Sequence, residues 1–246
     1  MRIPRYFIDQ TLEINQPFSL PDELHRHAVQ VLRSKLGDPL ILFNGSGGEY
    51  LGEFAAVDKR QSSVVLNSFD SVDRESPLDI RLILALIKSD KFDFALQKAV
   101  EMGVSSIQPV IAARSVMNLK ASRLEKKNQH WQGVINSACE QSGRTCVPEL
   151  FPVVSFSDYL SQSTGRMNLV MLPEATEYLS ELHEPTLPIS LLVGPEGGFH
   201  DEEVALIKQQ QVQTVKFGPR ILRAETAVIA GLALCQSQWG DLLHTG

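Results

Sequence analysis

A short apolar segment that ends in a glycine-rich bend constrains the fold of this chain more than any other feature. Residues 189–193 read Ile-Ser-Leu-Leu-Val, and residues 194–199 continue as Gly-Pro-Glu-Gly-Gly-Phe. Such a segment is typical of a strand that is buried on both faces in a parallel sheet. Because glycine has no side chain, the bend leaves backbone N–H and C=O groups accessible, which favours close approach of a flat, polar small molecule.

A second bend places an arginine, a carboxylate and a helix start in one short segment. Residues 217–227 read Phe-Gly-Pro-Arg-Ile-Leu-Arg-Ala-Glu-Thr-Ala. Gly218 begins a tight turn, and Thr226 can satisfy backbone groups near the helix start. The helix that follows is apolar on nearly all sides and rich in small residues, so we expect it to be buried, either in the core or against a second subunit. Together the two bends predict a cofactor site.

The two bends favour a cationic cofactor over a phosphate. The chain has neither a G-x-x-x-x-G-K-[ST] loop nor a G-x-G-x-x-G loop with a downstream acid, and Glu196 in the first bend would repel a phosphate. The sulfonium of S-adenosyl-L-methionine is cationic, and its adenine needs backbone donors and acceptors. For residues 194–199 alone, an ordinary strand-to-helix turn is the alternative. A dinucleotide site in an open sheet is a further alternative, which the missing glycine pattern disfavours.

Residues 1–72 show several short strand patterns and one helix pattern, typical of a small antiparallel barrel. The expected strands are Arg5–Ile8, Pro39–Asn44, Glu49–Val57 and Ser62–Phe69, and the expected helix is Pro21–Arg33. The segment Ser71–Pro77 is polar and ends in proline, so we expect it to be the linker to a second domain.

Residues 73–246 alternate strand and helix patterns, which predicts an α/β domain with a mostly parallel sheet. The expected strands are Leu78–Ile87, Ile107–Ala112, Asn168–Leu172, Ile189–Val193 and Thr214–Phe217. The expected helices are Lys91–Met102, Leu124–Glu140, Asp201–Gln210 and Arg223–Trp239.

Composition limits the class of protein. The formal net charge of −6 argues against a general nucleic-acid binder, although basic residues gather in the first 35 residues and in residues 114–127. Each cluster is also consistent with an ordinary solvated surface. The three cysteines form no C-x-x-C pair, which predicts free thiols and no metal site. The start lacks a signal-peptide core and the longest apolar run, 227–235, is too short to span a bilayer, so we expect a cytoplasmic protein with no membrane segment.

The two bends, read in order, resemble the ribosomal small subunit methyltransferase E family, which belongs to the knotted SPOUT class of RNA methyltransferases. The resemblance runs through the whole chain. Further matching segments are Arg5-Tyr6-Phe7, His27-x-x-x-Val31-Leu32-Arg33, Gly37-Asp38, Lys88, Lys98-x-x-Glu101-x-Gly103-Val104 and Glu140-Gln141-Ser142-Gly143-Arg144. The chain departs from the pattern at Ala113, where the family commonly has glutamate, and at His200, where it commonly has serine. Because histidine caps helices poorly, we expect Asp201 to take over the cap.

The resemblance implies an architecture and a reaction. It implies a PUA-like, RNA-binding β-barrel in residues 1–72 and a SPOUT domain with a deep trefoil knot in residues 73–246. It also implies a homodimer through the knotted region, with RNA bound across both subunits. The implied reaction is methylation of N3 of one uridine (U1498) in the decoding region of 16S rRNA, with S-adenosylmethionine as the methyl donor. The protein's partners are therefore expected to be 16S rRNA or the small ribosomal subunit.

The resemblance also implies which residues form the site. The implied cofactor-binding residues are Leu172, Pro173, Glu174, Val193, Gly194, Pro195, Glu196, Gly197, Gly198, Phe217, Gly218, Ile221, Leu222, Arg223, Thr226 and Ala227. The implied RNA-binding residues are Arg5, His27, Arg33, Lys88, Arg114 and Arg144. Arg223 and Glu225 are the catalytic candidates.

Uridine chemistry suggests roles for the two catalytic candidates. Uridine N3 carries a proton at neutral pH, so a site must accept that proton and stabilise negative charge on the base oxygens. Arg223 is the candidate for the electrostatic role, a contribution of about 3 kcal/mol. Glu225 is a candidate proton acceptor, although holding Arg223 or nearby backbone is its favoured role. The alternatives left open are a non-catalytic, S-adenosylmethionine-sensing, rRNA-binding assembly factor, and a related enzyme that acts on tRNA or on a ribose hydroxyl.

Overall fold

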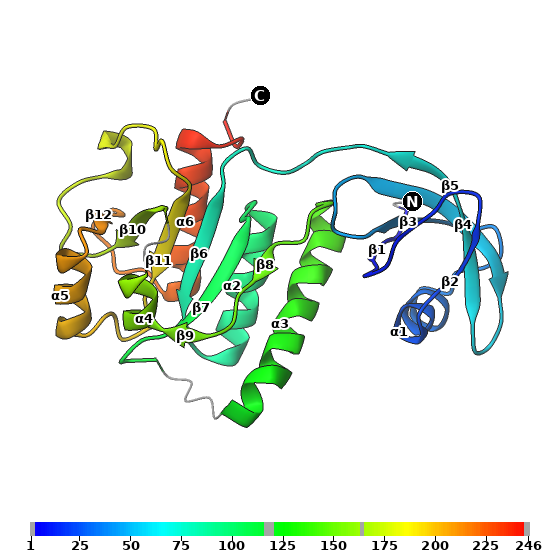
Figure 1. Ribbon diagram of the computed structural model, residues 1–246, viewed down its shortest axis with the longest axis horizontal. Helices are drawn as coiled ribbons and strands as arrows, with labels where there is room; N and C mark the ends of the chain where they lie inside the picture. The colour runs from blue at the N-terminus through cyan, green and yellow to red at the C-terminus, as the bar shows by residue number, and fades with distance from the viewer. Residues whose placement is uncertain (1–2, 116–120, 163–164, 244–246) are drawn as a thin grey trace. The chain divides into compact units, whose positions relative to one another are not determined.

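The computed structural model describes residues 3–115, 121–162 and 165–243, and the chain forms two compact units (Figure 1). The first unit contains Met1–Glu75 and Cys139–Val147, and the second contains Ser76–Ala138 and Pro148–Gly246. The expected domains, 1–72 and 73–246, divide the chain at nearly the same point but leave residues 139–147 with the second domain. Among the described helices, none has the length and apolar character needed to cross a membrane.

The first unit is built on one mixed five-stranded sheet with the strand order β1-β3-β4-β5-β2. Its elements in chain order are β1 (Arg5–Phe7), β2 (Pro17–Ser19), α1 (Asp22–His25), the π-helical segment η1 (Arg26–Val31), β3 (Pro39–Phe43), β4 (Glu49–Val57) and β5 (Ser62–Asp70). The expectation of a wholly antiparallel arrangement is wrong for β1, which pairs with β3 in parallel. The residues between these two strands include a helix and are long enough for the crossover that a parallel pair requires.

A buried arginine explains why residues 139–147 belong to the first unit. Arg5 on β1 donates hydrogen bonds to Glu49 Oε2 at 2.8 and 3.1 Å. The same guanidinium donates to the carbonyl oxygens of Cys139 at 3.0 Å, Glu140 at 3.3 Å and Arg144 at 3.2 Å. The Arg5 side chain is only 7% exposed. Because a buried charge must be paired and hydrogen-bonded, this one residue fixes the segment against β1 and β4.

A second buried ion pair holds the other end of the same segment. Arg144 donates from Nε to Glu75 Oε2 at 2.8 Å, and its Nη2 contacts the same oxygen. The other oxygen of Glu75 accepts the backbone N–H groups of Thr145 at 3.2 Å and Cys146 at 3.1 Å. Glu140 accepts the backbone N–H of Phe7 at 2.9 Å. Side-chain hydrogen bonds of Arg5, Glu75, Glu140 and Arg144 therefore attach residues 139–147 to the first unit.

The second unit contains a seven-stranded sheet in which every pairing is parallel, as the sequence predicted for most of the sheet. The strand order is β12-β10-β11-β6-β7-β8, and β9 also pairs with β7. The strands are β6 (Ile80–Ala85), β7 (Ser106–Ile111), β8 (Glu149–Leu150), β9 (Val154–Ser155), β10 (Met167–Met171), β11 (Ile189–Val193) and β12 (Gln213–Val215). Strand β11 is buried along its whole length.

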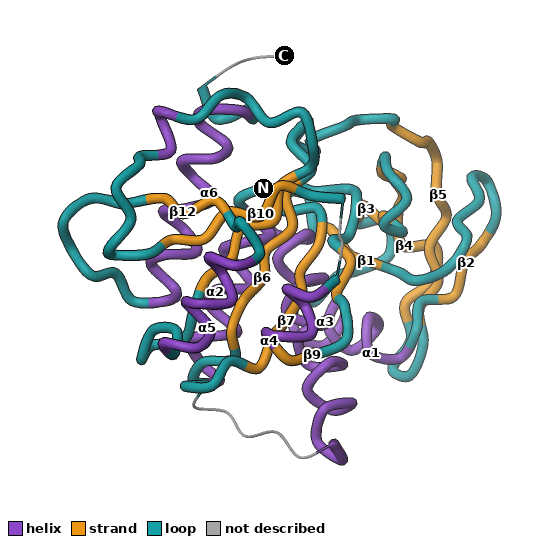
Figure 2. The backbone as a smooth tube through the Cα atoms, turned by 60° about the vertical axis from the view of Figure 1, so that its left-hand side comes forward, coloured by secondary structure: helices purple, strands orange, loops and turns teal. Residues whose placement is uncertain are grey.

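Helices lie next to this sheet, and Figure 2 shows α2, α5 and α6 beside its strands. The helices are α2 (Ser89–Glu101), α3 (Ala121–Ser142), α4 (Phe156–Ser161), the 3-10 turn η2 (Leu179–Glu181), α5 (Asp201–Gln209) and α6 (Ala224–Trp239). Helix α6 approaches β10 and β11 closely at Gly231, where a Cβ atom would lie 2.8 Å from Leu191 Cδ2 and 2.9 Å from Met171 Sδ. The small residues of α6 thus allow one side of this helix to pack in the core of the unit. Burial in the core was one of the two arrangements predicted for this helix from the sequence.

Removing the Arg5 side chain should destabilise the first unit. Arg5→Ala leaves the buried Glu49 carboxylate with only Arg74 beside it, so we expect the free energy of unfolding to fall by about 3 kcal/mol. Urea denaturation followed by circular dichroism measures this loss, and Lys59→Ala in the exposed turn between β4 and β5 is the control. Equal stability of the two variants would show that the Arg5 network contributes nothing.

The same substitution should also change how stability depends on pH. Burial alone would raise the pKa of Glu49, but hydrogen bonds and charge from Arg74 and Arg5 outweigh burial and lower it. Because the pKa of Glu49 is lower in the folded state than in the unfolded state, its ionised carboxylate contributes its full stabilisation at pH values above the unfolded-state pKa. This contribution is lost as the pH falls through the folded-state pKa. The difference between wild type and Arg5→Ala should therefore be largest near neutral pH and narrow below about pH 4. A difference that grows on acidification would contradict the assignment.

Candidate functional site

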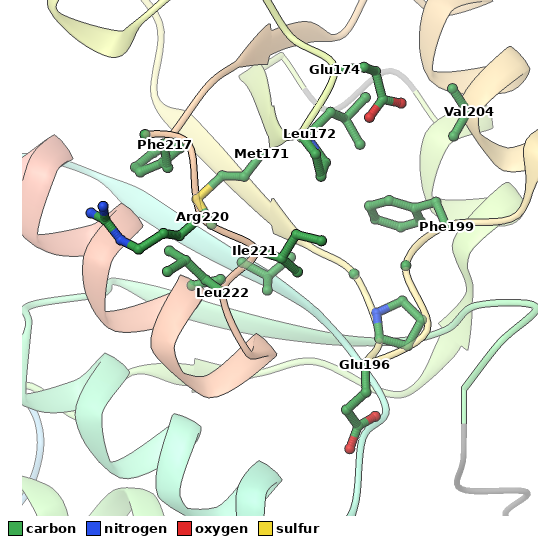
Figure 3. Close-up of a pocket in the computed structure, with 17 residues that line it drawn as sticks. Met171, Leu172, Glu174, Glu196, Phe199, Val204, Phe217, Arg220, Ile221 and Leu222 are labelled. Atoms are coloured by element: carbon green, nitrogen blue, oxygen red, sulfur yellow. The ribbon is translucent and has the colours of Figure 1, made fainter.

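A cavity of about 280 Å³ lies beside the carboxyl ends of the neighbouring strands β10, β11 and β12 (Figure 3). Loops that follow these strands form most of its wall. The lining residues are Met171, Leu172, Pro173, Glu174, Val193, Gly194, Pro195, Glu196, Gly198, Phe199, Val204, Phe217, Gly218, Arg220, Ile221, Leu222 and Ala227. The volume is close to the lower end of the range of small-molecule sites, and the wall is mostly apolar, as is usual for such sites.

The structure brings together nearly all the residues that the sequence assigned to a cofactor. Of that set, only Gly197, Arg223 and Thr226 do not line the cavity. The sequence did not assign four further lining residues, Met171, Phe199, Val204 and Arg220. Phe199 and Arg220 lie within the two bends, and Met171 directly precedes an assigned residue, so extending the motifs would have found them. Val204 has no local signal, because its place depends on how α5 packs.

The first bend is shaped by an aromatic ring that folds back beneath it. A Cβ atom on Gly194 would lie 2.9 Å from the ring of Phe199, so only glycine leaves room for this ring. Phe199 is buried and stacks on Phe156 with ring centroids 4.7 Å apart. Gly198 has a positive φ of 69° and donates its N–H to the carbonyl of Pro195 at 2.9 Å. The bend is therefore a preformed turn.

The acidic side chain of the first bend does not face the cavity, contrary to the argument from sequence. Glu196 borders the cavity, but its carboxylate points away from it in Figure 3. It accepts the backbone N–H of Lys88 at 3.2 Å, at the start of α2. A carboxylate there is favourable because helix N-termini carry partial positive charge. Glu196 therefore borders the cavity while its carboxylate serves the start of α2, and Glu174 is a second acidic residue at the cavity edge (Figure 3).

The cap of α5 also differs from expectation. His200 is itself the N-cap residue, and its Nδ1 accepts the backbone N–H of Glu202 at 3.5 Å. Glu203 completes the capping box by accepting the backbone N–H of His200 at 2.8 Å. The prediction that Asp201 takes over the cap was wrong, because the reciprocal bond from Glu203 compensates for a weak histidine acceptor.

The second bend carries one exposed and one buried charged residue. Arg223 is the exposed N-cap of α6, and among the described residues no hydrogen bond or ion pair involves its guanidinium. Glu225 is buried, and its carboxylate lies 3.3 Å from Lys91 Nζ of α2. Glu225 therefore pairs with Lys91 and not with Arg223. The guanidinium of Arg223 is left available for a ligand or substrate.

Two family patterns match the chain. One, described as an RNA methyltransferase domain, matches residues 74–236, and the other, described as an RNA methyltransferase PUA domain, matches residues 20–67. A relative from Buchnera aphidicola, named ribosomal RNA small subunit methyltransferase E, is 34% identical over 242 residues, which cover 98% of each chain. This chain belongs to the ribosomal RNA small subunit methyltransferase E family.

Solved structures confirm the fold class of this methyltransferase. The crystal structure of a ribosomal RNA small subunit methyltransferase E from Neisseria gonorrhoeae, bound to S-adenosyl methionine, is 36% identical with a TM-score of 0.91, and covers 98% of this chain and 100% of that chain. A structure from Legionella pneumophila, in complex with the bound cofactor SAM, is 34% identical with a TM-score of 0.95 and the same coverage. The predicted N-terminal PUA domain and SPOUT-type α/β domain are thus confirmed. The trefoil knot stays a prediction.

The six RNA-binding candidates of this methyltransferase have different surroundings. Arg5 and Arg144 are buried in ion pairs within the first unit, which argues against the predicted RNA contacts. His27 and Arg33 are exposed in the first unit, and Lys88 is exposed in the second. Arg114 donates its Nη1 to the carbonyls of the first bend. The sequence could not separate these cases, because the partners of a buried arginine are distant in sequence.

Cysteine and metal chemistry have little structural support in the described residues. Burial raises the pKa of the Cys139 and Cys235 thiols to about 12, so both remain protonated and weakly nucleophilic at neutral pH. No group of three His, Cys, Asp or Glu side chains is placed to share a metal ion in residues 3–115, 121–162 and 165–243.

Adding one methyl group at the first bend should disturb its packing. Gly194→Ala places a Cβ against Phe199, and we expect overpacking to lower the free energy of unfolding by about 2 kcal/mol. Gly133→Ala is the matched control, since this exposed position of α3 has nothing within 4 Å. The control should be stabilised by about 0.5–1 kcal/mol through its higher helix propensity. Urea denaturation measures the free energy of unfolding of both variants. A Gly194→Ala variant as stable as wild type would mean that Phe199 can move aside without cost.

Proposed function

We propose that this protein transfers a methyl group from S-adenosylmethionine to N3 of one uridine in the decoding region of 16S rRNA. One observation carries the proposal: two side-chain-poor bends and the loop after β10 converge on one cavity, and Arg223 follows the cavity-lining residue Leu222. Membership in the family adds the class of reaction. The experiment that tests it is incubation of the protein with 16S rRNA or small subunits and methyl-labelled S-adenosylmethionine, with mapping of the modified nucleotide.

The cavity residues fit this methyl donor. Leu172, Val193 and Leu222 provide apolar surface for a flat adenine, and the glycines of both bends leave backbone groups accessible beside it. Glu174 at the cavity edge is an acidic group of the sign that a sulfonium or ammonium favours. When bound, the donor supplies an electrophilic methyl group to the target base.

The first unit supplies the features expected of an RNA-binding surface. In η1 and the loop after it, Arg26, His27, Arg33 and Lys35 are exposed. Exposed apolar side chains, including Leu36 at 69% exposure, lie in the same segment and are available to contact bases. Phosphate contacts from such cations position RNA without reading its sequence. A local basic face therefore accompanies an overall net charge of −6.

The residues of the second bend suggest how uridine becomes a nucleophile. N3 can attack only after its proton leaves, and the resulting charge spreads to O2 and O4. The exposed guanidinium of Arg223 is suited to stabilising those oxygens. Glu225 is buried in the first turn of α6 and already ion-paired with Lys91 at 3.3 Å. We therefore assign Glu225 to positioning the first turn of α6, and the N3 proton leaves to solvent.

The assembly and location are part of the same proposal. We propose a homodimer that joins through the region of the trefoil knot, a cytoplasmic location, and a donor site that includes Gly197 and Thr226 although neither lines the cavity. Leu234 on α6 is 45% exposed, so one part of this apolar helix remains available to a second subunit. Sedimentation of the full chain tests the dimer.

A non-catalytic assembly factor that binds rRNA and senses S-adenosylmethionine is the alternative function. Such a factor would use the same cavity and the same RNA-binding surface, but it would not need Arg223 for catalysis. Absence of labelled product on both naked rRNA and assembled subunits, with intact cofactor binding, would favour this alternative over the enzyme.

Arg223→Ala should separate cofactor binding from methyl transfer. We expect the affinity for S-adenosylmethionine, measured by calorimetry, to stay within about threefold, while turnover falls by about 10²–10³-fold because the oxyanion loses its donor. Arg223→Lys should recover part of the rate. The exposed Arg60 of the first unit gives the control Arg60→Ala. Wild-type turnover in Arg223→Ala would remove this residue from the mechanism.

Charge reversal on the basic surfaces should weaken RNA binding. Arg33→Glu and Lys126→Glu should each lower RNA affinity and reduce the dependence of log K on log salt by about 1, because one phosphate contact is lost. Filter binding at several salt concentrations measures both quantities, with Lys59→Glu as a control of equal charge change. Equal effects of all three substitutions would mean that only net charge matters.

A further inference from the structure

A single arginine in the segment after β7 clamps the first bend of the cavity. Arg114 lies just after β7, and its Nη1 donates to the carbonyl oxygen of Gly197 at 3.0 Å and to that of Phe199 at 3.3 Å. Its aliphatic stem packs on the same bend, since a Cβ on Gly197 would lie 3.4 Å from Arg114 Cβ and Cδ. Arg114 itself does not line the cavity, so it holds the bend without occupying the ligand space.

A second contact joins the same two segments. Glu203 on α5 accepts the backbone N–H of Ala113 at 2.8 Å through Oε1 and the backbone N–H of His200 at 2.8 Å through Oε2. The carboxylate therefore bridges the residue before Arg114 and the residue after Phe199. Two charged side chains, Arg114 after β7 and Glu203 on α5, connect the end of β7 to the glycine-rich bend.

This bend needs such contacts because its own sequence is flexible. Gly197 and Gly198 lose more conformational freedom on ordering than any other residue type would. Phe199 anchors one end through its buried ring, but the two glycines have no side chains to pack. An external clamp that orders them before the ligand arrives reduces the entropy lost on binding.

We propose that Arg114 is a positioning residue for the methyl-donor loop and not an RNA contact. The proposal rests on the proposed function, because it names what sets the affinity of that site for S-adenosylmethionine. By holding the carbonyls of Gly197 and Phe199, the guanidinium fixes the bend in the shape that receives the donor. Glu203 supports the same geometry from α5.

The RNA-contact alternative makes a different prediction from the clamp. A phosphate contact needs the positive charge, which lysine retains. The clamp needs a planar group that reaches two carbonyls while its stem covers the glycines, which lysine reproduces poorly. Arg114→Lys therefore separates the two roles, and Arg114→Ala removes both.

The test is calorimetric titration of the full-length protein with S-adenosylmethionine, together with filter binding of 16S rRNA by the cofactor-free protein. Arg114→Ala should weaken S-adenosylmethionine binding about tenfold and Arg114→Lys about threefold or more, from the loss of charge-assisted hydrogen bonds. RNA affinity should change by less than about twofold in Arg114→Lys. In turnover assays, KM for the donor should rise while kcat at saturating donor stays within about twofold. Lys208→Ala, another exposed cation of the second unit, is the control.

A double-mutant cycle adds a readout that a general loss of stability would not give. Arg114→Ala and Glu203→Ala both loosen the same pair of segments, so their effects on donor affinity should be less than additive. Additive effects would overturn the clamp, as would wild-type donor affinity in Arg114→Lys together with reduced RNA affinity in Arg114→Ala. If the wild-type protein binds no S-adenosylmethionine, the proposed function itself fails. Binding by wild type with no change in either Arg114 variant rejects only the clamp.

Discussion

Parallel pairing of β10, β11 and β12 is the constraint on which the rest of the second unit depends. Parallel strands end at a common edge, so the loops after them meet even though they are separated in sequence. The approach of α6 to β10 and β11 at Gly231 positions the helix into which the second bend leads. A larger residue there would push α6 away from Met171, which itself lines the cavity. The cavity is thus a consequence of strand order and one close helix contact.

The charged residues of this chain fall into groups with different physical roles. Arg5 and Arg144 lie in buried pairs, where the loss of hydration must be compensated by fixed partners, and they hold residues 139–147 in the first unit. Arg114 organises a backbone that has no side chains of its own. Arg223 retains an exposed guanidinium beside a cavity-lining loop. Only the last kind of placement leaves a charge free to act on a substrate, which is why it carries the catalytic proposal.

Local patterns predicted the elements that are long or strongly apolar. The boundaries of β11 agree with the sequence, and those of α2 and α6 agree within two residues. Strands β2, β8 and β9 and helix α4 were missed, because two to six residues carry too little periodicity and form only against neighbouring elements. The helix expected over Pro21–Arg33 is instead the short α1 followed by η1.

The sequence by itself determined the two bends and the alternation of strands and helices after residue 77, because these depend on glycine positions and hydrophobic periodicity along the chain. The resemblance of its ordered motifs pointed to the family. Only the tertiary structure decided which charged groups remain free. It turned Glu196 toward the start of α2, paired Glu225 with Lys91, and placed Arg114 on the carbonyls of the first bend. Each of these contacts joins residues more than 80 positions apart in the chain, and no local pattern carries information about the partner of a charged side chain at that distance.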